Sequence, residues 1–257
     1  MLARQRQELI LEQVRTSGGA RVSDLVESLG VSDMTVRRDI EALARRGLVA
    51  RVHGGATSVA VLSTQEPSFG LKSSFRMAQK EGIARAAAAL VEPGASVAVS
   101  GGTTTYAVAR ELSRENLTVV TNSLPVAELM HRERPGLPVV LTGGERSPSE
   151  ALVGPVAVAA LRTLHVDWLF LGVHGMDARA GFTTPDLMEA ETDRALIASA
   201  RRVVVTADSS KWGLVGLSSI ARLDEVDVLV TDDGLDAEAT RTARSRLGRL
   251  VLAPTRT

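Results

Sequence analysis

The stretch VSDMTVRRDIEALARRGLVARVHGGA, residues 31–56, decides the fold of the N-terminal part of the chain. Ser32 precedes a run in which apolar residues recur every three or four positions, the period of a helix with one buried face: Val36, Ile40 and Leu43. Gly47 ends this run, and the residues after it alternate in hydropathy up to a Gly-Gly pair. The stretch therefore predicts a capped helix, then a strand that ends in a tight turn.

Two further helical patterns precede this stretch. The first carries one apolar stripe and ends at the Thr-Ser-Gly-Gly run of residues 16–19: Leu9, Ile10, Gln13 and Val14. The second is short, with Ser23 as its predicted cap, and Gly30 ends it. Two helices joined by a tight glycine turn are typical of a helix-turn-helix.

The third helix presents polar residues on the face opposite its apolar stripe. Thr35, Arg37 and Arg38 lie in its first turns, which reach base edges and phosphates when such a helix enters a major groove. The strand that follows carries Arg51 and His53, as a basic wing would. Residues 1–56 contain nine arginines against seven acidic residues, so charge alone leaves a solvated helix face as the alternative.

As a whole, residues 31–56 resemble the winged helix-turn-helix of the DeoR family of bacterial transcriptional repressors. The matching pattern joins VS..T.RRD to R.HGGA, and Ile40 stands where the family often has leucine. The resemblance implies binding to double-stranded operator DNA. The DNA-contacting residues that we expect are Ser32, Asp33, Met34, Thr35, Arg37, Arg38, Arg45, Arg51, His53 and Gly54.

Composition limits the remaining classes of function. The 257 residues carry 30 basic and 30 acidic side chains, so nucleic-acid binding must be local. There is no cysteine, which excludes disulfides and thiolate metal sites, and the four histidines have no metal-ligand spacing. No apolar run resembles a signal peptide or a membrane span, so we expect a soluble, cytoplasmic protein.

The second part of the chain alternates strands and helices. Five apolar strands each end in small or polar residues, which predicts an open parallel α/β sheet. Ligands bind such sheets beyond the carboxyl ends of the strands. We expect a DNA-binding domain at residues 1–57, a linker at 58–74, and an effector-sensing and oligomerisation domain at 75–257.

One of the strand-to-helix loops, SGGTTT at residues 100–105, is suited to an anion. Gly101 and Gly102 let backbone amides approach a ligand, and Thr103, Thr104 and Thr105 add hydroxyls at a helix start. The same residues equally suit a capped turn. The loop is neither a Walker loop nor a dinucleotide fingerprint.

Neighbouring loops offer complementary groups. Lys211 supplies a cation, Asp177 and either Glu189 or Glu191 are potential acceptors for sugar hydroxyls, and His174 is a potential donor. An exposed lysine, a solvated helix face and a satisfied loop histidine are the structural alternatives.

This part resembles the sensor domain of DeoR regulators, which is similar in fold to ribose-5-phosphate isomerase. The resemblance implies a phosphorylated sugar or similar metabolite as effector. The full set of expected contacts is Ser100, Gly101, Gly102, Thr103, Thr104, Thr105, Thr121, Asn122, Ser123, Gly143, Gly144, His174, Gly175, Asp177, Glu189 and Lys211. Ser100 and Gly101 replace the family's usual Asp-Ser, and Asp193 stands where many relatives carry a basic residue.

An enzyme is the main alternative to a sensor. An isomerase needs a base and a cation, and Glu189 or Glu191 could serve as base, but no lysine lies near Gly181, where such isomerases carry a Lys-Gly-Gly stretch. We therefore predict a repressor of a carbohydrate operon, without cofactor or metal, acting as a homodimer or homotetramer. A sugar-phosphate isomerase or deaminase and a non-sensing oligomerisation module are the alternatives.

Overall fold

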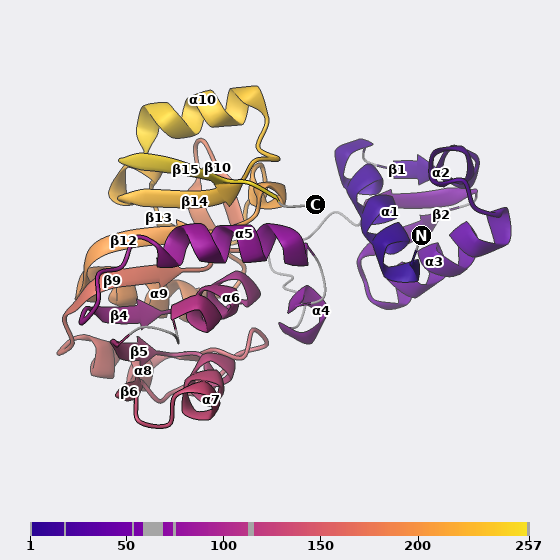
Figure 1. Ribbon diagram of the computed structural model, residues 1–257. Helices are drawn as coiled ribbons and strands as arrows, with labels where there is room; N and C mark the ends of the chain where they lie inside the picture. Colours follow the sequence, from indigo (N-terminus) through magenta and orange to yellow (C-terminus); the bar gives the residue numbers. More distant parts are fainter. Residues whose placement is uncertain are drawn as a thin grey trace. The chain divides into compact units, whose positions relative to one another are not determined.

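The computed structural model describes residues 2–17, 19–52, 54–58, 69–73, 76–112 and 116–255. The chain divides into two compact units, Met1–Leu62 and Ser63–Thr257 (Figure 1). Most of the predicted linker lies outside the described residues, although a short helix, α4 (Phe69–Ser73), falls within it and belongs to the second unit. The domain limits at residues 57 and 74 stay predictions.

The first unit contains three helices and a small antiparallel sheet. Its elements are α1 (Ala3–Ser17), β1 (Gly19–Arg21), α2 (Val22–Leu29), α3 (Asp33–Arg45), β2 (Val49–Val52) and β3 (Gly55–Ser58). The strand order is β1-β3-β2, so β3 pairs on both sides. The apolar stripes of the helices meet in one core that includes Ile10, Val14, Leu25, Val36, Ile40 and Leu43.

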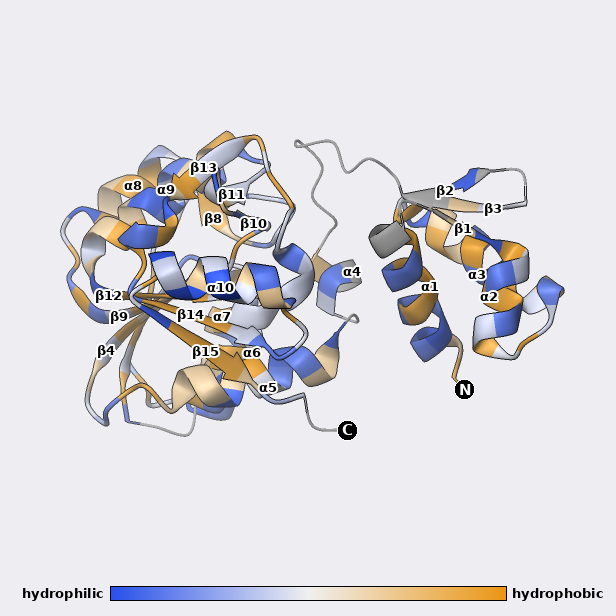
Figure 2. Cartoon of the chain, turned by 90° about the horizontal axis from the view of Figure 1, so that it is seen from above, coloured by the Kyte–Doolittle hydropathy of each residue, from blue (hydrophilic) through white to orange (hydrophobic). Residues whose placement is uncertain are grey.

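The predicted helix-turn-helix is present, with one error at a helix start. Ser32 caps α3 by accepting a hydrogen bond from the Thr35 N–H. Ser23 does not cap α2, because that helix begins at Val22 after Arg21, and the Ser23 hydroxyl donates to Asp24 instead. The apolar faces of these helices can be followed in Figure 2.

The second unit is built on a seven-stranded sheet whose described neighbours are all parallel, in the order β15-β14-β12-β9-β4-β5-β6. The strands are β4 (Ser96–Val99), β5 (Thr118–Thr121), β6 (Val139–Leu141), β9 (Val166–Leu171), β12 (Ala200–Thr206), β14 (Val228–Asp232) and β15 (Arg249–Ala253). The five predicted strands are confirmed. The chain adds β14 and β15 beside β12, which extends the sheet on that side.

Helices cover both faces of this sheet. Buried residues of α5 (Met77–Ala88), α6 (Thr103–Leu112) and α7 (Leu124–Glu133) form one core with Val97 and Val99. Residues of α8 (Pro155–Leu161), α9 (Leu187–Ser199) and α10 (Ala237–Arg246) form the other with Ala98. Successive residues of β4 thus point to opposite cores, as expected for a strand buried on both faces.

Short elements line the loops around the sheet. A hairpin-like pair, β7 (Glu145–Arg146) and β8 (Leu152–Val153), precedes α8, and a three-stranded sheet joins β10 (Gly175–Asp177), β11 (Gly181–Thr184) and β13 (Ser218–Ala221). Two single turns of 3-10 helix occur at Ser209–Lys211 and Leu223–Glu225. The predicted fold class, a winged helix-turn-helix followed by an open parallel α/β domain, is confirmed.

Candidate DNA interface and effector site

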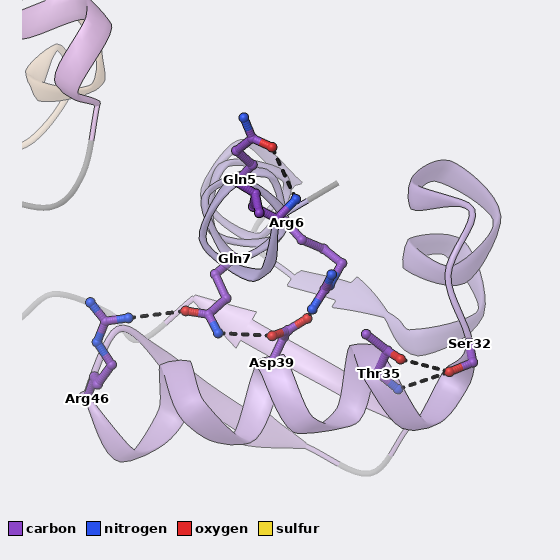
Figure 3. Close-up of polar contacts among 8 residues, drawn as sticks. Gln5, Arg6, Gln7, Ser32, Thr35, Asp39 and Arg46 are labelled. Atoms are coloured by element: carbon purple, nitrogen blue, oxygen red, sulfur yellow. Dashed lines mark hydrogen bonds and ion pairs between the residues drawn. The ribbon is translucent and has the colours of Figure 1, made fainter.

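The exposed side of α3 begins with a tightly closed turn. The Ser32 hydroxyl lies 2.8 Å from the Thr35 hydroxyl and accepts from the Thr35 N–H at 3.3 Å (Figure 3). Met34, which lies between these two residues, is 63% exposed, an unusual exposure for a large apolar side chain. The first turn of α3 therefore presents a hydrogen-bonded polar cap beside an exposed apolar side chain.

Arg37 is paired in the free protein. Its Nε donates to Asp33 Oδ1 at 2.5 Å and its Nη2 to Asp33 Oδ2 at 3.3 Å, a two-point contact across one helical turn. Arg45 is the last residue of the same helix, and its Nη1 lies 3.2 Å from Oε1 of Glu41, one turn earlier. Arg38 is exposed between these pairs. The basic residues of α3 are thus on the surface, and two of them are partly neutralised.

A buried polar cluster that was not predicted from the sequence joins α1 to α3. Asp39 is 4% exposed and accepts from Arg6 Nε at 2.5 Å and from Gln7 Nε2 at 2.9 Å (Figure 3). Gln7 in turn accepts from Arg46 Nη1 at 3.3 Å. The available signal was the place of Asp39, which immediately precedes Ile40 and lies three residues after Val36 on the core side of the helix.

The wing is a hairpin with a third strand beside it. β2 and β3 pair in antiparallel register from Val49↔Ser58 to Val52↔Gly55, and β1 pairs with the other edge of β3. Arg51 and Gly54 are exposed on this hairpin, whereas His53 lies outside the described residues. β1 was not predicted because a three-residue strand that begins at the second glycine of a pair is too short to show a period.

The SGGTTT loop joins β4 to α6, as predicted. Ser100 is 1% exposed, and its hydroxyl accepts from the Gly172 N–H at 2.9 Å and donates to the Gly101 carbonyl at 3.2 Å. A Cβ on Gly101 would lie 2.6 Å from the Ala151 Cβ, and Gly102 has φ +135°, so both positions require glycine. Thr104 and Thr105 are buried, and the Thr105 hydroxyl donates to the Gly102 carbonyl.

The loop after β5 holds its neighbours together. Asn122 accepts from the Gly101 N–H at 3.1 Å and donates to the Leu152 carbonyl at 3.1 Å, so it ties the β4 and β8 segments. Thr121 donates to the Val99 carbonyl, and Ser123 caps α7. All three side chains are buried. The structure therefore brings together the loops that follow β4, β5 and β9, with the polar side chains of Thr121–Ser123 engaged in protein contacts.

Gly143 and Gly144 follow β6 and reach the start of α8. A Cβ on Gly143 would lie 3.5 Å from Val156, and one on Gly144 would lie 2.6 Å from the Val153 carbonyl oxygen. Both glycines lie at the same carboxyl edge of the sheet as the SGGTTT loop, because β5 and β6 are parallel neighbours.

His174, Gly175 and Asp177 lie on and before β10. The His174 side chain is buried, and its backbone N–H donates to the Thr183 carbonyl. Asp177 accepts from the N–H groups of Arg179 and Ala180 at 2.8 Å each, and these bonds hold the pKa of its carboxyl below the usual range. In this structure Asp177 closes the turn between β10 and β11.

Of the two candidate glutamates, only Glu189 is buried. Hydroxyls of Ser147 and Ser149 donate to its Oε1, the first at 2.7 Å, and the Thr184 hydroxyl donates to its Oε2 at 3.1 Å. The carboxylate therefore holds three hydroxyls from two segments, the connection between β7 and β8 and the end of β11. Glu191 is exposed on the same helix.

Lys211 lies in a cluster of cations around one carboxylate. Asp208 is 4% exposed, accepts from the Ser210 N–H and hydroxyl, and lies 3.6 Å from Arg76 Nε. Burial acts to raise the pKa of Asp208, but the charges of Lys211, Arg76 and Lys80 and the hydrogen bond from Ser210 together outweigh it, so the net pKa is lowered. Cations from different segments thus surround the buried Asp208 carboxylate at the carboxyl end of β12.

Lys80 is the least expected member of this cluster. It is 7% exposed on α5, and its ammonium donates to the Lys72 carbonyl of α4. Burial lowers its pKa to about 8, with Asp208 opposing that shift and Lys211, Lys72 and Arg76 adding to it. A lysine in an alanine-rich helix reads as solvent-facing in the sequence, so Arg76 and Lys80 were not among the predicted site residues.

In the described ranges, no group of three or more His, Asp or Glu side chains is placed to hold a metal ion. No helix in the same ranges is long and apolar enough to cross a membrane.

Comparisons with protein families match both units. A model described as the DeoR-like helix-turn-helix domain matches residues 6–61, and one described as the DeoR C terminal sensor domain matches residues 76–233.

Full-length relatives carry regulatory names. A putative aga operon transcriptional repressor from Escherichia coli O157:H7 is 34% identical, over 93% of this chain and 90% of that protein. The HTH-type transcriptional regulator GlpR of Haloferax volcanii is 37% identical, over 95% and 96%. A lactose phosphotransferase system repressor from Streptococcus mutans is 34% identical, over 90% and 93%. These names indicate a DNA-binding regulator rather than an enzyme.

Solved structures give weaker likenesses. The beta subunit of eIF2B from Chaetomium thermophilum matches with a TM-score of 0.47 and 13% identity, over 69% of this chain and 55% of that chain. Ribose 5-phosphate isomerase A from Methanocaldococcus jannaschii matches with a TM-score of 0.39 and 18% identity, over 52% and 53%. The fold assignment therefore rests on the strand order and on the family models.

Proposed function

Because the chain belongs to the DeoR family of transcriptional regulators, we propose that it represses a carbohydrate operon and leaves its operator when a phosphorylated sugar binds. The observation that carries this proposal is that one chain contains two different candidate binding surfaces, one on each unit. One unit presents a capped helix and a wing, and the other gathers glycine, hydroxyl and lysine groups at the carboxyl edge of a parallel sheet.

On the DNA side, α3 is the element that we place in the major groove. Its exposed first turns carry Arg37 and Arg38, which suit guanine edges and phosphates, and Met34, which suits a thymine methyl group. Arg51 on the wing contacts the neighbouring backbone. The other predicted contacts at Ser32, Asp33, Thr35, Arg45, His53 and Gly54 belong to the same proposal.

On the effector side, the SGGTTT loop and Lys211 are the groups that we assign to the phosphate. The loop offers backbone amides at the start of α6, where the helix dipole favours an anion. Lys211 adds positive charge from the neighbouring β12 loop. The relative with a lactose phosphotransferase system name supports a phosphorylated sugar as the class of effector.

We assign the sugar end of the effector to the remaining predicted residues. Glu189 already accepts hydrogen bonds from the hydroxyls of Ser147, Ser149 and Thr184, so it is the acceptor that we assign to a sugar hydroxyl, and Gly143, Gly144 and Gly175 permit close backbone approach. Thr121, Asn122, Ser123, His174 and Asp177 shape the loops that surround it.

Repression requires two winged units on one operator, so we propose a homodimer or homotetramer. Helix-turn-helix dimers read half-sites about one helical turn of DNA apart. An effector that favours an arrangement with another spacing lowers operator affinity, and the operator lowers effector affinity by the same factor.

The test uses the full chain, an operator selected from random duplexes, and a set of pentose and hexose phosphates. We expect Arg38→Ala to abolish operator binding while the phosphorylated sugars still raise the melting temperature, and Lys211→Ala to do the reverse. Arg222→Ala, a change of an exposed arginine on the second unit, serves as the control. Normal operator binding by Arg38→Ala at fixed salt contradicts the helix assignment, and no melting shift with any sugar phosphate contradicts the effector class.

A further inference from the structure

The short helix α4 is fastened to the second unit at two points. The ring of Phe69 packs edge-on against Tyr106 of α6, with centroids 5.9 Å apart and an interplanar angle of 83°. At the other end of α4, the Lys72 carbonyl accepts from the buried Lys80 ammonium of α5. Figure 1 shows α4 beside α6. Helices α5 and α6 already pack on the sheet through their own apolar residues, so neither contact with α4 is needed to hold them there.

Each fastening point adjoins one of the proposed phosphate-binding loops. Tyr106 directly follows Thr103–Thr105, and its N–H donates to the Gly102 carbonyl within the SGGTTT loop. Lys80 interacts electrostatically with Asp208 and Lys211 of the β12 loop. Through Tyr106 and Lys80, the five-residue helix α4 therefore contacts one residue that interacts with each of the two loops that we assign to the effector.

The charge balance at the second point favours a response to an anion. Lys211, Arg76 and Lys80 all interact with the buried Asp208 carboxylate, and Lys72 interacts with Lys80, so the buried Lys80 ammonium lies among other cations. An ammonium group has three donors and no acceptor, and a phosphate is a stronger acceptor than a peptide carbonyl. A phosphate beside Lys211 thus competes with the Lys72 carbonyl for Lys80.

The position of α4 in the chain connects the effector site to the winged unit. It follows the first unit and precedes α5, so every covalent path from the sheet to the winged unit passes through it. From these observations we infer that α4 is the coupling element of the regulator: a phosphorylated effector at the sheet edge loosens the Phe69–Tyr106 and Lys72–Lys80 contacts, and the change in α4 alters how the winged units are held for DNA. This inference rests on the proposed function and deepens it.

Phe69→Leu is the central variant, because it removes the ring contact while retaining an apolar side chain and lies outside the proposed binding groups. We expect it to bind the selected operator more weakly than the wild type even without effector, because the ring contact that the effector would loosen is already absent, and to keep the melting shift with sugar phosphates. The sugar phosphate should lower operator affinity at least about tenfold in the wild type, a usual size for allosteric coupling. In Phe69→Leu that factor should fall towards one, and Phe69→Tyr, which keeps the ring, should restore it.

Arg110→Ala provides the matched control, since Arg110 also bridges two helices, reaching Glu81 of α5 from α6, but on the exposed surface. It should keep the full coupling factor. A Phe69→Leu protein whose operator affinity still falls as in the wild type overturns the inference. If no sugar phosphate shifts the melting temperature of the wild type, the proposed effector class fails instead, and the coupling role fails with it.

A second measurement does not depend on any variant. Amide hydrogen exchange of residues 69–73 in the wild-type chain should become faster when the active sugar phosphate is added, while exchange in the core strand β9 stays unchanged. Unchanged exchange in α4 at a ligand concentration that shifts the melting temperature also overturns the inference.

Discussion

The Nε atom of Arg37 lies 2.5 Å from Oδ1 of Asp33, one turn earlier on α3. Two residues expected to face DNA thus hold each other in the free protein. An arginine engaged in this way has to leave its carboxylate before it contacts a phosphate or a guanine. The Asp33–Arg37 pair therefore lowers affinity for DNA of unrelated sequence, and it favours operator sequences whose contacts with Arg37 compensate for the lost ion pair.

Asp33→Asn should therefore raise affinity for any duplex. It removes a negative charge from the DNA-facing side and releases Arg37 for phosphate contacts, and one added charge-assisted contact corresponds to about tenfold in affinity. Gel shifts at one salt concentration, with operator and with unrelated duplex, measure the effect. We expect the larger gain on unrelated DNA, and equal affinity of variant and wild type for both duplexes would contradict the role of the pair.

Asp39→Ala should destabilise the first unit. The substitution leaves Arg6 and Gln7 without their shared acceptor in a position that is nearly fully buried, and breaking a buried pair from one side costs about 3 kcal/mol or more. Hydrogen exchange of amides in α1 and α3 reports this unit separately from the sheet. The matched control is the double change Arg6→Met and Asp39→Leu, which replaces both charges by apolar groups and should recover most of the loss.

Ser100→Asp should change which sugar is recognised more than whether phosphate is held. Ser100 is the buried first residue of the SGGTTT loop and contacts Gly172 and Gly101, so a carboxylate there keeps an acceptor for the Gly172 N–H and adds a charged acceptor near the proposed sugar site. A thermal-shift series with pentose and hexose phosphates gives the ranking of ligands, and inorganic phosphate gives the phosphate contribution alone. An unaltered ranking would show that position 100 does not select the sugar.

Lys80 should make the stability of the second unit depend on pH in the alkaline range. Its pKa in the folded chain is about 8, below the ordinary lysine value of 10.5, because the ammonium is buried. Between these two values the unfolded chain binds more protons at this position than the folded chain, so the free energy of unfolding rises with pH there. The full gain from this group is roughly 3 kcal/mol.

Lys80→Met removes this contribution. Urea unfolding of both proteins at several pH values between about 7.5 and 10.5 gives the difference in unfolding free energy. We expect the wild type to gain on the variant as pH rises through this window. Parallel curves would mean that Lys80 keeps its ordinary pKa in the folded chain.

The parts of the fold that the sequence predicted are those set by local pattern. Ser32 as a cap, the apolar stripe of α3 and the buried strands before each glycine loop all follow from residue types a few positions apart. Contacts between distant segments left no such pattern. Arg6 and Asp39 are 33 residues apart, and nothing in either neighbourhood marks the other as its partner.

The candidate site was predicted in the same uneven way. The glycine and hydroxyl loops were identifiable because parallel strands bring their carboxyl ends to one edge. Lys80 was not, since its burial depends on α4 and on Asp208, which lie on either side of it in sequence. Ser23 shows the opposite error: a good capping residue was assigned to a helix that begins one residue earlier, because Val22 completes the core.

The central place of β3 in the small sheet has a mechanical consequence. β3 is the last described segment of the first unit, and it is held by hydrogen-bond ladders to β1 on one side and to β2 on the other. Tension applied along the chain beyond Ser58 loads both ladders in shear, whereas an edge strand would peel away one bond at a time. The force therefore reaches β2, and through it the end of α3, with the hairpin still paired, so the strand that completes the wing is also the strand by which the rest of the chain can pull on the DNA-binding unit.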